Sequence, residues 1–155
     1  MPKTSQLNFE YRNDDVNSSL GILAIRLAVG IPISMVAGFV GNIINGIFVP
    51  SPIAGDEIAF IARMLVLGIA VSTGGMVAWF NALESKSWAM TIWIIASIGG
   101  LGSAVLAYYL GSTYIDHPDV YILNQRLTQT IIIGAAIGSN VVAAGVSIMR
   151  TRMSG

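Results

Sequence analysis

Cysteine is absent from this sequence, and histidine occurs only once. Without a thiol the chain cannot form a disulfide, a cysteine-ligated zinc or iron–sulfur site, or a cysteine nucleophile. A single histidine cannot supply both axial ligands of a haem. The sequence therefore predicts no self-contained haem, iron–sulfur or zinc site and no metal site of its own, and it leaves other cofactors open.

Charge is also scarce. Charged residues make up 10% of the 155 residues, against about 25% in a typical soluble domain. The 8 basic and 8 acidic residues balance, which gives no sign of nucleic-acid binding. Hydrophobic residues reach 54%, and four apolar runs each exceed the length of about 20 residues that crosses a bilayer. The sequence predicts an all-α integral membrane bundle of four transmembrane helices within residues 20–150, at about 20–49, 58–83, 88–111 and 120–149.

Polar tails flank this bundle at residues 1–19 and 151–155. Four spans place both tails on one side, and six of the eight basic residues lie near helix ends on that side. The positive-inside rule then favours cytoplasmic termini, and we expect a prokaryotic plasma membrane. Tryptophans are typical of the membrane interface, so a cytoplasmic-side belt is predicted at Trp79, Trp88 and Trp93.

Small residues recur at four-residue spacing in the spans, a pattern that lets helix backbones approach closely in membranes. The members of these stripes are Gly30, Ser34, Gly38, Gly46, Gly99, Ser103, Gly134 and Gly138. Their number exceeds what the packing within one four-helix bundle requires. The stripes therefore predict contacts with lipids and with copies of the chain or other membrane subunits, with helix 20–49 as the outer contact.

A faint internal repeat has an offset of 63 residues. It aligns Asp56 with Asp119, Arg63 with Arg126, and Gly75 with Gly138. Two parallel helical hairpins in tandem, derived from a duplication, would explain the offset.

Arg63 and Arg126 are the main candidates for a binding site, because ionisable residues inside membrane spans are costly. They can bind an anion or a lipid headgroup, or they can extend to the membrane surface and meet acidic loop residues. Asn42, Asn45 and Asn140 also need partners in hydrocarbon. They can line a polar path or form hydrogen bonds between helices.

No motif for nucleophilic, metal-assisted or phosphate-transfer catalysis is present. The sequence therefore predicts a non-enzymatic membrane subunit that acts through helix packing in a homo-oligomer or a larger membrane complex. The alternative is a small channel or transporter, with a path lined by the three asparagines and the two arginines at its outer end.

Overall fold

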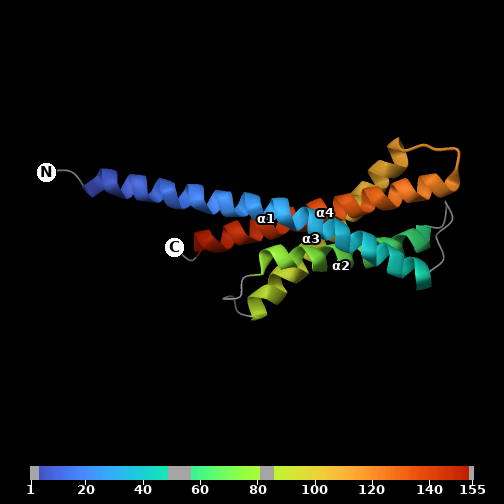
Figure 1. Cartoon of the computed structure of the whole chain (residues 1–155), viewed down its shortest axis with the longest axis horizontal. Coiled ribbons are helices and arrows are strands. Elements are labelled where there is room, and N and C mark those ends of the chain that lie inside the picture. The colour runs from blue at the N-terminus through green and yellow to red at the C-terminus, as the bar shows by residue number, and fades with distance from the viewer. Residues whose placement is uncertain (1–3, 49–56, 81–85, 154–155) are drawn as a thin grey trace.

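A computed structural model describes the backbone of residues 4–48, 57–80 and 86–153, and the side chains of residues 20–47, 58–80 and 87–150. Every regular element in these ranges is a helix (Figure 1). The four are α1 (Thr4–Phe48), α2 (Glu57–Trp79), α3 (Lys86–Tyr114) and α4 (Val120–Met153). Each contains a stretch long and apolar enough to cross a membrane. The predicted all-α bundle of four transmembrane helices is confirmed.

Helix α1 begins at Thr4, inside the segment that the sequence marked as a polar tail. Residues 4 to 20 contain neither glycine nor proline, and extending an existing helix costs far less than nucleating a new one. The helix also continues through Pro32, which membrane helices tolerate because neighbouring groups satisfy the freed backbone carbonyl. The other predicted boundaries differ from the observed ones by at most four residues, and the start of α4 at Val120 is as predicted.

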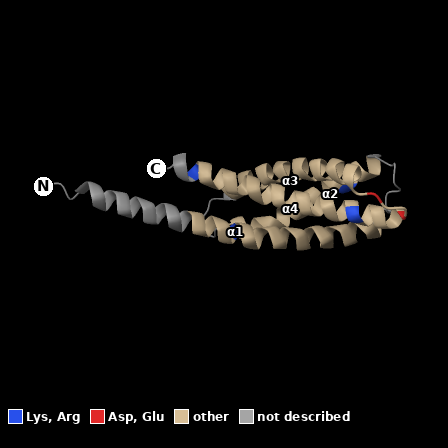
Figure 2. Cartoon of the chain, turned by 90° about the horizontal axis from the view of Figure 1, so that it is seen from above, with Lys and Arg blue, Asp and Glu red and all other residues tan. Residues whose placement is uncertain are grey.

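The helices form two hairpins, α1 with α2 and α3 with α4, that pack side by side (Figure 2). Helices α2 and α4 contact each other at the centre, and over the described residues α1 does not contact α3. The most apolar window of α1 is accordingly 11% buried, against 44% for α4. Both termini lie at one end (Figure 1), and we call the opposite end, where α2 and α4 begin, the distal end.

Two apolar clusters fill the bundle. The distal one centres on Leu67, Val71 and Ile131, and the other contains Trp79. Trp79 ends the apolar span of α2, as a position near the interface requires. It is 1% exposed, however, and its indole Nε1 donates a hydrogen bond to Asn140, so the predicted contact with the headgroups is wrong. The central position of α2 explains the difference, because the inner face of that helix meets protein along its whole length. Trp88 matches the interfacial prediction better, with Arg150 stacked 4.7 Å from its ring centre.

Most of the small residues lie where helices cross. A methyl group on Gly138 would collide with Ser103 and lie 2.9 Å from the carbonyl oxygen of Gly99. Gly30, Ser34 and Gly38 of α1 are buried against α2 and α4. The inner stripe of α1 is therefore occupied within the chain and is not free for another subunit.

The remaining glycines of the predicted stripes differ in what lies beside them. Gly99 packs on Val142, and Gly134 packs on Ser103. Gly46 has no atom within 4 Å of an added methyl group. Of the predicted stripe on α1, only this last glycine faces open space.

The packing of the two hairpins repeats. Gly75 of α2 packs on Ser34 of α1, and Gly138 of α4 packs on Ser103 of α3. The two glycines are 63 positions apart and the two serines 69. A neighbouring contact follows the same offsets, because Gly38 with Val71 corresponds to Ala107 with Gly134. These equivalent crossings support the tandem-hairpin interpretation, with six fewer residues between the equivalent packing positions in the second hairpin.

Candidate functional site

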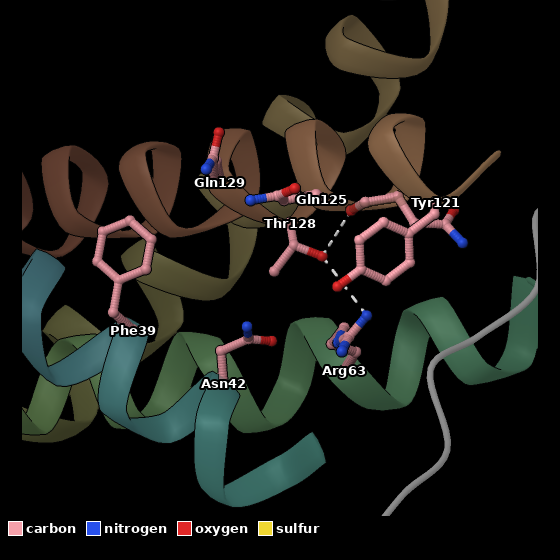
Figure 3. Close-up of a pocket in the computed structure, with 8 residues that line it drawn as sticks. Phe39, Asn42, Arg63, Tyr121, Gln125, Thr128 and Gln129 are labelled. Carbon is pink, nitrogen blue, oxygen red and sulfur yellow. Dashed lines mark hydrogen bonds between the residues drawn. The ribbon is translucent and has the colours of Figure 1, made fainter. Parts of the chain in front are cut away.

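A polar pocket of about 200 Å³ lies in the distal half of the bundle, between α1 and α4 and above α2 (Figure 3). Its lining comes from three helices and consists of Phe39, Asn42, Arg63, Tyr121, Asn124, Gln125, Thr128 and Gln129. The volume is far more than the 10–15 Å³ that hold one water molecule, and less than the roughly 300–1,000 Å³ of drug-sized sites. The pocket therefore fits a small polar group.

Arg63 supplies the charge of the pocket. It lies six residues into α2, about 9 Å below the start of that helix at 1.5 Å per residue. Its side chain is 7% exposed, and its Nη1 donates a long hydrogen bond of 3.5 Å to Thr128 Oγ1. The Thr128 hydroxyl in turn donates to the carbonyl oxygen of Asn124 at 2.8 Å. Arg63 Nε is buried with no hydrogen-bond partner.

No carboxylate among the described side chains contacts Arg63. Those side chains include only two acidic residues, Asp116 and Asp119. Asp119 caps α4, because its Oδ1 accepts hydrogen bonds from the backbone N–H groups of Tyr121 and Ile122 at 2.8 and 3.4 Å. The loop carboxylate that the sequence paired with Arg63, Asp56, lies outside the described residues.

Asn42 of α1 faces Arg63 across the pocket (Figure 3). Its Oδ1 is buried and accepts no hydrogen bond. A buried polar atom without a partner costs free energy, and native structures keep few of them. The buried atoms without a hydrogen-bond partner on residues that line the pocket thus include a donor, Arg63 Nε, and an acceptor, Asn42 Oδ1.

The rim of the pocket opens sideways between α1 and α4. Its rim residues Phe39, Tyr121, Gln125 and Gln129 are all exposed. The three on α4 are spaced by four and so share one helix face. Gln129 lies nine residues into α4, about 14 Å from its start. Amides at this depth on a lipid-facing surface are costly, so the rim marks a place where something polar meets the bundle.

The other predicted polar residues lie elsewhere. Arg126 is exposed and does not line the pocket, although it occupies the position equivalent to Arg63 in the repeat. Asn140 is 1% exposed, accepts from Trp79 Nε1, and donates to Ser34 Oγ and to the Ala136 carbonyl oxygen, each at 2.8 Å. Asn140 therefore links three helices as an internal hydrogen-bond centre.

Asn45 is half-buried and lines no pocket that we describe. The distal apolar cluster, with Leu67, Val71 and Ile132 each fully buried or nearly so, lies between the pocket and Asn140. The structure therefore brings Asn42 and Arg63 together, and it leaves Arg126, Asn45 and Asn140 apart from them.

A second, larger depression of about 340 Å³ lies between α2 and α3. Its lining is apolar apart from one tyrosine and consists of Ile61, Met64, Leu65, Leu101, Gly102, Val105 and Tyr109. Tyr109 is its only side chain that can donate or accept a hydrogen bond, so the depression suits a hydrocarbon tail better than a polar group. Among the described residues no cluster of three metal-ligating side chains is present.

Sequence reasoning missed the contribution of α4 to the pocket. Thr128 binds Arg63, and Gln125 and Gln129 form the rim. A signal was available, because two glutamines four residues apart inside a membrane span break the apolar pattern as clearly as an arginine does.

The site offers hydrogen-bond donors and one fixed positive charge to an oxyanion, and its lining holds no carboxylate, imidazole or thiol among the described residues. Such donors and a fixed charge can bind and orient an oxyanion. No family model, characterised protein or solved structure matches this chain.

Proposed function

We propose that this chain is a non-enzymatic integral membrane protein that binds an anionic group in the distal pocket. The observation that carries the proposal is Arg63, a guanidinium that is 7% exposed and touches no carboxylate among the described side chains. Leaving an ion buried without a counter-charge costs several kcal/mol. A bound anion offsets this cost.

The expected gain follows from Coulomb's law. Two unit charges about 4 Å apart interact by about 4 kcal/mol at an effective dielectric constant of 20. The sideways opening admits solvent or headgroups and weakens the attraction. One third of this Coulomb energy still corresponds to roughly a tenfold change in affinity.

A matched pair of arginines tests the proposal. Binding of dodecyl phosphate, an amphiphilic oxyanion, is measured by calorimetry on the protein in uncharged maltoside micelles. We expect Arg63→Gln to weaken binding by about tenfold or more and Arg63→Lys to retain part of it. Arg126→Gln removes an exposed arginine at the same end of the bundle and should change the affinity by less than about twofold. Equal binding by Arg63→Gln and the native chain would contradict the proposal.

The basic residues near the helix ends favour cytoplasmic termini, which supports a pocket on the outer side of a prokaryotic plasma membrane. This orientation is part of the proposal. It matters because it decides which leaflet or compartment supplies the anion.

A role as a packing subunit of a homo-oligomer or larger complex is a second candidate. The observation in its favour is the shallow burial of α1, whose apolar window is only 11% covered within the chain. Gly46 of α1 and Gly102 of α3 also leave open space beside them, where another helix can approach. Particle mass in mild detergent tests this candidate, and a monomeric particle for both the native chain and Gly46→Leu would count against it.

The channel or transporter alternative receives less support. A path would have to join Asn42 to Asn140 through the apolar cluster around Leu67 and Val71. The hydrogen bonds of Asn140 already use both ends of its amide. Flux through proteoliposomes that was lost on Asn140→Leu, in a chain that remained folded, would restore the alternative.

A further inference from the structure

We infer that the anionic group is the headgroup of a phospholipid that enters sideways between α1 and α4 and carries a hydroxyl beyond its phosphate. The inference rests on the proposed function and names the ligand class of the same pocket. Its basis is two buried atoms without a hydrogen-bond partner, Arg63 Nε and Asn42 Oδ1, on two residues that line one small cavity (Figure 3).

The two atoms demand different chemistry. Arg63 Nε is a donor on a cation, so it takes an anionic oxygen. Asn42 Oδ1 is an acceptor, and an ionised phosphate oxygen cannot donate to it. A hydroxyl on the same ligand can. A phosphodiester with a hydroxylated headgroup, such as glycerol, satisfies both atoms at once, whereas a fully ionised oxyanion supplies no donor for Asn42 Oδ1.

The depth of the pocket in the membrane favours a lipid over a free anion. The charged floor lies about 9 Å from the start of α2, and the rim amide Gln129 about 14 Å from the start of α4. The membrane span of α4 has 31 residues, about 46 Å, which exceeds the hydrocarbon thickness of about 30 Å by roughly 8 Å at each end. The pocket therefore begins near headgroup level and continues below it.

The opening has the character of a lipid site. Phe39 and Gln129 form the part of the rim that faces outward between the two helices, and both are exposed. The surface of α1 beside the opening is apolar, with Val36, Val40 and Ile43 all exposed. An acyl chain can lie on this surface while the headgroup enters the pocket. A free anion makes no such contact with the apolar surface.

Native mass spectrometry tests the inference on the full chain. The protein is stripped of lipid and equilibrated with phosphatidylglycerol and phosphatidylmethanol of identical acyl chains. Both lipids are phosphodiester anions, and only phosphatidylglycerol carries the extra hydroxyls. We expect one anionic lipid retained per chain and a preference for phosphatidylglycerol of about 2- to 10-fold, the worth of one hydrogen bond.

Three variants separate the roles of the pocket atoms. Asn42→Leu should keep lipid binding and lose the preference, whereas Arg63→Gln should lose retention of both lipids by about tenfold or more. Arg126→Gln should match the native chain. Circular dichroism and elution volume establish that each variant is folded, and Asn42→Leu, which removes an amide whose Oδ1 has no partner, is the variant least exposed to misfolding.

The outcomes distinguish failure of the lipid inference from failure of the proposed function. Equal retention of the two lipids by the native chain, or an unchanged preference in Asn42→Leu, overturns the assignment of the hydroxyl. If dodecyl phosphate binds through Arg63 but no diacyl lipid is retained, the lipid inference fails and the proposed function stands. Displacement of dodecyl phosphate by inorganic phosphate would identify a free anion as the ligand. If no probe depends on Arg63, both fail.

Discussion

Replacing Asn140 by leucine is expected to destabilise the bundle by about 1–3 kcal/mol. Two of its hydrogen bonds join helices, because Asn140 accepts one from Trp79 Nε1 and donates one to Ser34 Oγ, each at 2.8 Å. Hydrogen bonds between helices in a membrane average about 0.6 kcal/mol and reach about 1.7, so two bonds give roughly 1.2–3.4 kcal/mol. Ser34 can turn its hydroxyl to a carbonyl of its own helix. The buried Trp79 indole cannot, which places the expected loss above the minimum.

The assay is reversible unfolding of the protein in mixed micelles as the detergent is exchanged for dodecyl sulfate, followed by circular dichroism. Asn45→Leu is the matched control, because Asn45 is half-buried and no hydrogen bond of its side chain is part of this network. It should change the free energy of unfolding by no more than about 0.5 kcal/mol. A double-mutant cycle with Trp79→Phe should show a coupling of about 0.5 kcal/mol or more. Equal stability of Asn140→Leu and the native chain, or an equal loss in both asparagine variants, would refute the reasoning.

Two further predictions concern packing and orientation. Gly138→Ala should be less stable than Gly102→Ala by about 1–3 kcal/mol, because the new methyl group meets Ser103 in the first variant and open space in the second. Both variants gain the same helix propensity, so the difference between them in the same unfolding assay reports packing alone. Equal stability would contradict the close crossing of α3 and α4. In intact cells a membrane-impermeant thiol reagent should label Ser112→Cys and spare Ser5→Cys, and the reverse pattern would invert the orientation.

The four spans were predictable because the transmembrane constraint acts on composition and length alone. The start of α1 at Thr4 was not, because it depends on helix propagation from the span into a segment whose residues are polar. Burial was predictable only in part. Trp79 has the composition signal of an interfacial residue, and it became a core residue because α2 lies at the centre of the bundle.

Two of the eight residues that line the pocket were predicted from the sequence. Arg63 and Asn42 stood out as polar residues in apolar spans. Arg126 and Asn140 stood out equally, and no periodicity in the sequence separates the residues that line the pocket from those that do not. The two arginines occupy equivalent repeat positions, so the difference between them arises from the side-by-side packing of the hairpins. Helix α1 covers the region around Arg63 from the side, whereas Arg126 points away from the bundle. Such a difference belongs to tertiary structure and leaves no mark on local sequence.

The occupancy of Arg63 Nε tests the central claim most directly. Protein labelled with ¹⁵N-arginine and held in uncharged bicelles gives separate Nε–H resonances for its arginines, which single substitutions assign. On addition of dodecyl phosphate we predict a downfield shift of the Arg63 Nε–H proton, since this buried donor then gains a charge-assisted hydrogen bond. The Arg126 resonance, from an exposed side chain, should move far less. An Arg63 resonance that stays in place while phosphate binds elsewhere on the chain would contradict the account.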